Sequence, residues 1–90
     1  MNKEIYRKLP RNGEVWRHFK GKDYLIREAN CLHTESDEYL VIYQALYYPF
    51  KVFARPLSNF MDRVDKDKYP EYKQLYRFAH YANSIEEYRI

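Results

Sequence analysis

The sequence predicts a mainly β domain, built either as a small SH3-like antiparallel barrel or as a strongly bent sheet, with one or two short helices. The first observation is the composition: of 90 residues, 11 are Tyr, 5 are Phe and 1 is Trp, and aromatic side chains favour half-buried strands. The second is the spacing of short apolar runs between turn residues, which is typical of antiparallel hairpins. Because a small flat sheet would leave its edges exposed, we expect the sheet to close or to bend strongly.

The first two strands form a predicted hairpin. Residues 14–19 alternate, with Trp16 and His18 on one side of the strand. A turn at Gly21 follows, and residues 23–32 return as the second strand.

The central strand of the sheet is predicted at residues 39–48, the run richest in β-branched and aromatic residues. Both of its faces are apolar. Leu40, Ile42 and Leu46 on one face are expected to be core residues, together with Phe60 farther along the chain. The opposite face is either the filled interior or a ligand groove, and it consists of Tyr39, Val41, Tyr43, Ala45 and Tyr47.

After the central strand, residues 51–55 are predicted to return as the next strand. Apolar residues at helical spacing then predict a helix of about two turns over residues 57–64, with Ser58 as its N-cap. A second short helical turn is expected over residues 70–74, where proline stands at the first position. Residues 75–81 fit either a helix or an alternating strand, and the strand is favoured.

The chain is long enough for one domain only. We expect a basic extension over residues 1–12, the domain over residues 13–81 and a polar tail over residues 82–90. Residues 1–22 carry seven Lys or Arg against two Glu, whereas residues 23–50 carry one Arg against five acids. Such asymmetry can steer an anionic partner toward one face.

Cys31 is the only cysteine, so no internal disulfide forms and no cysteine cluster exists for zinc. It lies in the second strand, whose alternation breaks at residues 28–30, and is expected to be buried as a small hydrophobic side chain. No apolar run resembles a signal peptide or a membrane span. The expectation is a cytoplasmic protein without a membrane partner.

A histidine turn and one arginine are the candidates for chemistry. His33, Thr34 and Glu35 precede the central strand, and a carboxylate beside an imidazole is how a general base is built. The same trio also makes an ordinary turn. Arg55, at a strand end, can hold a carboxylate or phosphate with two hydrogen bonds, or it can pair with an acid such as Glu35. No catalytic residue is assigned, and neither a metal site nor a cofactor is expected.

Several ordered motifs carry a family resemblance. They are W-R-H-F-K-G at 16–21, H-T-E at 33–35, L-V-I-Y-Q-A-L-Y at 40–47, F-A-R-P-L at 53–57, Phe60 and Y-P-E-Y-K-Q-L-Y-R-F at 69–78. Together they resemble a bacterial family known only as domain of unknown function 1653. The resemblance implies a compact domain, standing alone or appended to another, and leaves the activity open. Tyr48 and Phe53 depart from the family's usual residues.

The sequence favours a non-enzymatic binding module that recognises a small ligand, a nucleotide or a peptide. The residues expected to line its surface are His18, His33, Thr34, Glu35, Tyr43, Tyr47 and Arg55. One alternative is a small enzyme or enzyme-associated domain that uses His33 and Glu35, with Arg55 as an anion clamp. The other is a single-stranded nucleic-acid binder acting through the basic N-terminal segment, where aromatic and basic residues interleave. The oligomeric state stays open.

Overall fold

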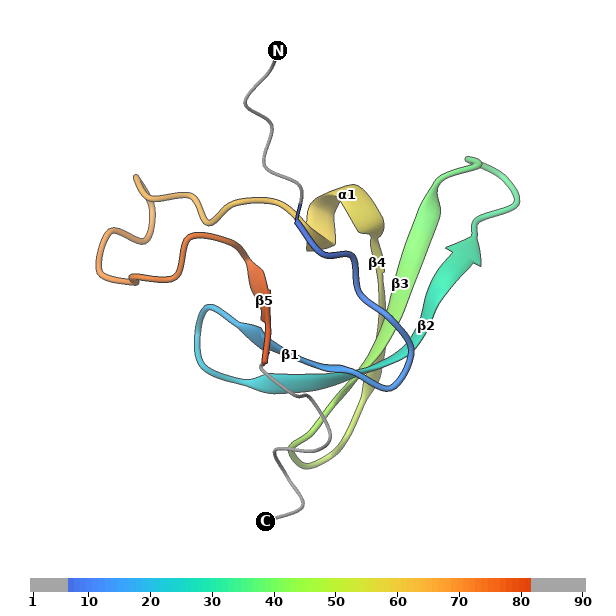
Figure 1. Cartoon of the computed structure of the whole chain (residues 1–90), viewed down its shortest axis with the longest axis horizontal. Helices are drawn as coiled ribbons and strands as arrows, with labels where there is room; N and C mark the ends of the chain where they lie inside the picture. The colour runs from blue at the N-terminus through green and yellow to red at the C-terminus, as the bar shows by residue number, and fades with distance from the viewer. Residues whose placement is uncertain (1–6, 82–90) are drawn as a thin grey trace.

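The computed structural model describes residues 7–81, so the start of the predicted extension and the whole predicted tail lie outside the described residues. Within that range, one antiparallel sheet has the strand order β4-β3-β2-β1-β5, and Figure 1 shows how strongly it curls. Its elements are β1 (Val15–His18), β2 (Asp23–Leu32), β3 (Tyr39–Ala45), β4 (Val52–Pro56), α1 (Leu57–Phe60) and β5 (Phe78–His80). The predicted mainly β class is confirmed in its bent-sheet form. The sheet does not close into a barrel, because β4 and β5 stay at its two edges.

The predicted first hairpin is present. β1 pairs with β2, and Trp16 lies opposite Tyr24. Gly21 has a φ of 99° in the connecting turn, a left-handed conformation that glycine adopts without steric cost. Its amide donates to the carbonyl of His18 at 2.8 Å, which closes the turn.

The break in alternation along β2 corresponds to two shifts in its register with β3, one between Ile26 and Glu28 and one between Glu28 and Cys31. Such irregularities bend a strand and increase its twist. The end of β2 therefore extends past the core, and Cys31 is half-buried there. The expectation of a buried Cys31 was wrong for this reason.

The middle strand of the sheet is β2, and β3 lies next to the edge, which corrects the predicted position of residues 39–48. Val41, Tyr43 and Ala45 are buried on the inner face of β3, whereas Leu46 is 38% exposed. Leu40 and Ile42 are half-buried on the outer face. The prediction of Leu40, Ile42 and Leu46 as core residues is therefore wrong, because the sheet curls toward the other face of β3. The prediction of Phe60 as a core residue is confirmed, since its side chain is fully buried.

The helix is shorter than predicted. It ends at Phe60, and the amide of Val64 donates instead to the carbonyl of Leu75 at 2.9 Å. The apolar side chains after Phe60 thus follow a β-bridge and not a helix. Pro56 occupies the N-cap position and no side chain caps the helix, so Ser58 does not have its predicted role.

Of the two predictions for residues 70–81, one is wrong and the other is confirmed. Residues 70–74 contain turns and no helix. Residues 75–81 contain β5, which pairs with β1 and places Phe78 opposite His18. The favoured strand is confirmed over three residues.

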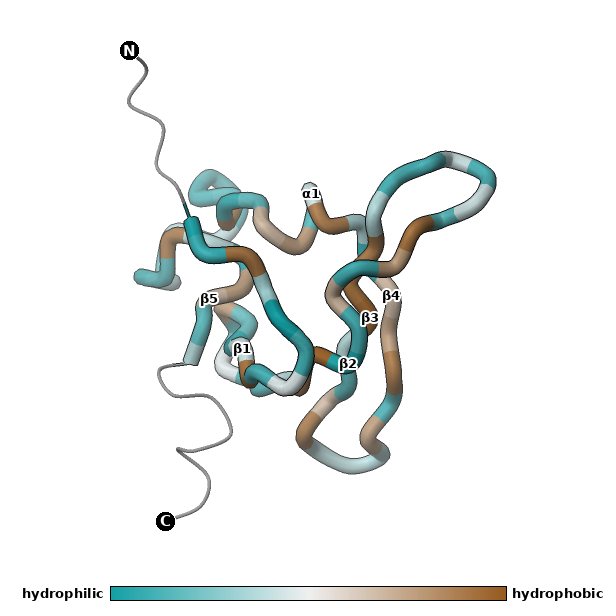
Figure 2. Tube along the Cα trace, turned by 45° about the vertical axis from the view of Figure 1, so that its right-hand side comes forward, coloured by the Kyte–Doolittle hydropathy of each residue, from teal (hydrophilic) through white to brown (hydrophobic). Residues whose placement is uncertain are grey.

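The core lies inside the curl of the sheet, and α1 covers it. The rings of Phe60 and Phe78 are stacked with their centroids 4.1 Å apart and their planes 5° from parallel. The buried cluster consists of Trp16, Ile26, Val41, Tyr43, Phe60 and Phe78. Figure 2 shows apolar segments on several of the strands and on α1. Aromatic rings supply most of its volume, as the composition suggests.

Arg7 connects the segment before β1 to the other end of the chain. Its guanidinium donates to the carbonyl of Met61 at 2.7 Å and to the carbonyl of Phe78 at 2.8 Å. The same group lies 3.7 Å from the centre of the Tyr76 ring. One cation thus joins the N-terminal segment, the chain after α1 and the edge strand β5.

In the part of the chain that the structure describes, no helix is long and apolar enough to cross a membrane.

Candidate functional site

Arg55 is the centre of the candidate site. It lies on β4 opposite Val41, so its side chain is on the inner face of the sheet. Its Nε donates to the hydroxyl of Tyr43 at 2.9 Å, and its Nη1 donates to Oδ1 of Asn59 at 2.6 Å. The guanidinium carbon is 5.6 Å from the centre of the Phe78 ring. Two acceptors and an aromatic ring therefore fix this side chain.

Both acceptors of Arg55 are neutral. Among residues 7–81, no Asp or Glu carboxylate lies within 4.0 Å of its guanidinium, although Glu35 was an expected partner. By comparison, Arg17 forms two hydrogen bonds with the carboxylate of Asp23, at 2.7 and 3.0 Å. Among the described residues, Arg55 is thus held in one orientation by neutral groups and has no carboxylate partner, an arrangement that suits an external anion.

His18 contacts the same Phe78 ring as this guanidinium. Its ring is stacked on Phe19, with 4.5 Å between the ring centres, and meets the edge of Phe78 at 5.0 Å. Burial, and then the nearby charge of Arg55, lower the pKa of His18 to about 4; Lys20 and Arg77 act in the same direction. At neutral pH the imidazole is uncharged in a field made positive by its neighbours.

A pair of tyrosines extends the aromatic lining. The hydroxyls of Tyr24 and Tyr47 are 2.6 Å apart, and the ring of Tyr24 also contacts those of Tyr43 and Phe53. Burial, and then the hydroxyl of Tyr47, raise the pKa of Tyr24, so this hydroxyl stays protonated at neutral pH. The ammonium of Lys22 lies 4.8 Å from the centre of the Tyr47 ring.

The histidine turn is separate from this cluster. Nδ1 of His33 accepts the amides of Glu35, at 3.1 Å, and Ser36, at 3.4 Å. Thr34 and Glu35 are exposed. The turn connects β2 to β3, and its hydrogen bonds stay within the turn, with the His33 amide donating to Glu38.

The sequence-predicted site residues therefore fall into two groups. His18, Tyr43 and Arg55 are brought together, and Tyr47 joins them through Tyr24. The turn residues His33, Thr34 and Glu35 are not part of that cluster. Sequence reasoning missed Asn59, which holds Arg55; its position four residues after Arg55, beyond the proline, was the available signal.

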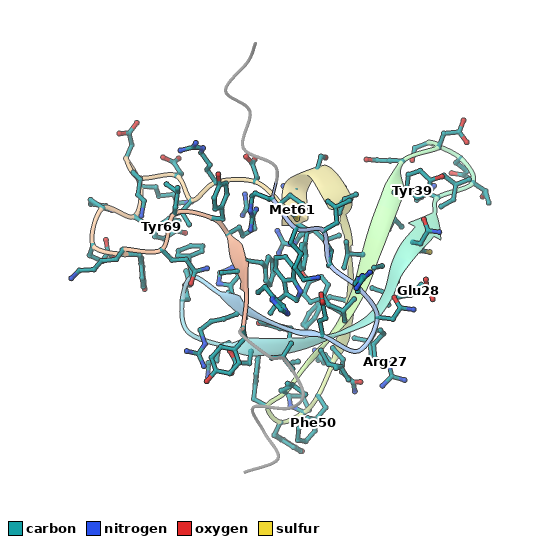
Figure 3. The ribbon with its side chains drawn as sticks, in the orientation of Figure 1. Arg27, Glu28, Tyr39, Phe50, Met61 and Tyr69 are labelled. Carbon is teal, nitrogen blue, oxygen red and sulfur yellow. The ribbon has the colours of Figure 1, made fainter. Side chains whose placement is uncertain are left out.

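A separate groove of about 430 Å³ lies on another part of the surface. It runs between residues 9–12 and the irregular part of β2 at residues 28–30, with Tyr39 and Leu57 completing it; Figure 3 labels Glu28 and Tyr39 in this region. Asn12 spans it, donating to Glu28 at 3.3 Å and accepting the amide of Ala29 at 2.8 Å. The break in alternation at residues 28–30 was the sequence signal for it.

Within residues 7–81, no group of three His, Cys, Asp or Glu side chains is arranged to hold a metal ion.

The family model described as "Protein of unknown function (DUF1653)" matches residues 14–81. The chain belongs to this family. The predicted family is thereby confirmed, and the DUF1653 region contains all the strands and the helix of the described structure. Arg7 lies outside it. No curated protein and no solved structure matches this chain.

Proposed function

We propose that this DUF1653 domain is a binding module that holds an anionic group, a carboxylate or a phosphate, on Arg55. The observation that carries the proposal is the state of this guanidinium: it is oriented by Tyr43 and Asn59, and neither acceptor is charged. An arginine whose fork is already oriented loses little freedom when it binds an anion.

The surroundings support the same chemistry. The positive charges that lower the pKa of His18 belong to Arg55, Lys20 and Arg77, so an anion in this region meets a favourable field. The neighbouring rings of Tyr24 and Phe53 supply apolar surface for the rest of a ligand. A charged contact flanked by aromatic rings is a common composition for a binding site.

The two alternative functions receive less support. The enzyme alternative requires His33 and Glu35 beside Arg55. Instead, Nδ1 of His33 accepts the backbone amide of Glu35 within their own turn. The nucleic-acid alternative requires accessible cations in the N-terminal segment. There Arg7 donates to two backbone carbonyls, and Lys8 pairs with Glu14 at 2.6 Å. Among the basic residues at 7–12, only Arg11 has an exposed side chain without a hydrogen bond or ion pair.

Thermal unfolding with three small anions tests the proposal. Pyrophosphate, adenosine monophosphate and glutarate are added to the wild-type protein, with sodium chloride matching the ionic strength. At least one of them is expected to raise Tm, because a ligand selective for the folded state stabilises it. Arg55→Gln should lose that increase.

Arg27→Gln is the matched control. Arg27 is exposed and donates to Gln44, so its removal takes away the same charge elsewhere on the sheet and should leave the increase intact. If none of the three anions stabilises the wild type more than Arg55→Gln, the proposed function is wrong.

A further inference from the structure

The outer edge of β4 has backbone groups that the sheet does not use. The amide of Ala45 donates to the carbonyl of Lys51 at 2.9 Å, which fixes the hydrogen-bonding alternation along the β3–β4 pair. By that alternation, Phe53 and Arg55 bond to β3, whereas the N–H and C=O groups of Val52 and Ala54 point away from it. Figure 2 shows β4 on the side of β3 that faces away from β2.

The side chains on this strand are accessible as well. Val52 is 57% exposed and Phe53 is 38% exposed, and Ala54 is exposed too. An exposed apolar edge is a template for pairing with another strand.

The charges on β4 decide what kind of strand fits. Lys51, Phe53 and Arg55 follow one another on the same face, since side chains alternate along a strand. The incoming strand that uses all four outward groups of Val52 and Ala54 places one residue opposite Phe53 and one opposite each cation. An acidic residue at those outer two positions meets Lys51 and Arg55 with complementary charge.

A second copy of the chain is disfavoured in that register. Antiparallel self-pairing centred on Phe53 would place Lys51 of one copy opposite Arg55 of the other, and it would do so twice. Like charges directly opposite one another destabilise a strand pair. Charge complementarity thus points to a different partner.

We infer that the partner of this site is an extended peptide segment with the pattern acid-x-apolar-x-acid, which adds to β4 as a further antiparallel strand. One acid binds the guanidinium of Arg55, the other binds Lys51, and the apolar residue packs on Phe53. The inference rests on the proposed function, because it identifies the anion on Arg55 as a peptide carboxylate. Main-chain hydrogen bonds supply affinity in such strand addition, and alternate side chains supply specificity.

A fluorescein-labelled peptide, Ser-Glu-Thr-Val-Thr-Glu-Ser, tests this by fluorescence anisotropy. Binding is expected, and a peptide with both Glu replaced by Lys should not bind. A third peptide, with both Thr replaced by Pro, keeps the charges but cannot donate to the edge of β4, and it should bind at least about tenfold more weakly. Equal binding of the Thr and Pro peptides would overturn the inference.

The edge is then blocked from the protein side. Ala54→Pro removes the outward N–H and leaves the bonds between β3 and β4 in place, so the domain should fold and the peptide should bind at least about tenfold more weakly. The increase in Tm with the small anions should persist in this variant because Arg55 is untouched. Unchanged peptide affinity in a folded Ala54→Pro variant counts against strand addition.

Amide hydrogen exchange gives the positional readout. The peptide should slow exchange at Val52 and Ala54, and faster or unchanged exchange at both would overturn the inference. Exchange at these amides should not depend on protein concentration when no peptide is present. If it slows as the protein concentration rises, a second copy of the chain occupies β4, and the inference is overturned as well.

The two proposals can fail separately. If a small anion acts through Arg55 while the peptide does not bind, the inference fails and the proposed function stands. If no anion acts through Arg55, the proposed function fails.

Discussion

The hydroxyl of Tyr43, a residue only 4% exposed, accepts a hydrogen bond from Nε of Arg55 at 2.9 Å. The ring of Tyr43 packs in the core against Phe60 and Phe78, so this bond fixes the guanidinium to the buried core of the domain. A core residue thereby acts as a positioning residue for the candidate site.

Tyr43→Phe should separate these two roles. The ring keeps its packing, so the fold should persist with a loss of about 1 to 2 kcal/mol, the usual effect of leaving one buried hydrogen-bonding group without its partner. The increase in Tm with the small anions should shrink but not vanish, because Asn59 still holds Nη1 of Arg55. Urea unfolding and the thermal assay measure the two effects. Full retention of the anion effect would mean that Tyr43 does not position Arg55.

Phe60→Ala and Leu46→Ala should differ strongly in stability. Phe60 is fully buried and stacked on Phe78, so its truncation should lower the free energy of unfolding by about 3 to 5 kcal/mol. Leu46 is 38% exposed, and its truncation should cost less than about 1 kcal/mol. Chemical denaturation of both variants measures this. Similar losses of stability in the two variants would mean that Leu46 is as much a core residue as Phe60, which would contradict the assignment of the inner face.

That contrast shows what the sequence can and cannot supply. The strands and the hairpin at Gly21 follow from alternation and turn chemistry, which are local. Which face of β3 is inside depends on the direction in which the sheet curls, and with apolar residues on both faces the local pattern does not decide it. For the same reason the helical spacing of residues 57–64 was misleading: Val64 is buried, as that spacing implies, but it is buried by a bridge to the chain before β5.

The candidate site was predictable only in part. Arg55 could be selected as a candidate anion ligand from its type and its position at a strand end. The histidine on the same side of the domain could not be assigned, since His18 and His33 look alike in sequence. The pairing of β1 with β5 places His18 against the ring of Phe78, which Arg55 also contacts. This arrangement joins residues far apart in the chain. His33 and Glu35 were predicted as site residues only because they are close in the sequence.

Arg7→Ala should destabilise the domain by about 2 kcal/mol or more, because two charge-assisted hydrogen bonds and the contact with Tyr76 are lost. Arg11→Ala is the matched control, since Arg11 is exposed and its hydrogen bonds come from the backbone; it should change stability by less than about 0.5 kcal/mol. Denaturation midpoints of the two variants decide the point. Equal, small effects would show that Arg7 does not hold the N-terminal segment to β5.

The stability of the domain should fall as the pH drops from about 6.5 to about 4, in part because of His18. Its pKa is about 4 in the folded protein, against an ordinary value of 6.5, so the unfolded chain takes up a proton in this window that the folded chain does not. The stabilisation is complete above pH 6.5 and is lost as the pH falls toward 4. Urea midpoints at pH 7.5 and pH 5 measure the change for the wild type and for His18→Gln. The variant should show the smaller decrease, and identical decreases would contradict the assignment to His18.

A bound anion should raise the pKa of His18. The positive charge of Arg55 is the largest electrostatic contribution that lowers this pKa, after burial, and an anion on the guanidinium offsets that charge. An NMR titration of the His18 ring protons, with and without the anion that gives the largest increase in Tm, measures the midpoint directly. The midpoint should move upward in the wild type and stay fixed in Arg55→Gln. A midpoint that the anion does not move in the wild type would place the anion away from Arg55, even if the anion raises Tm.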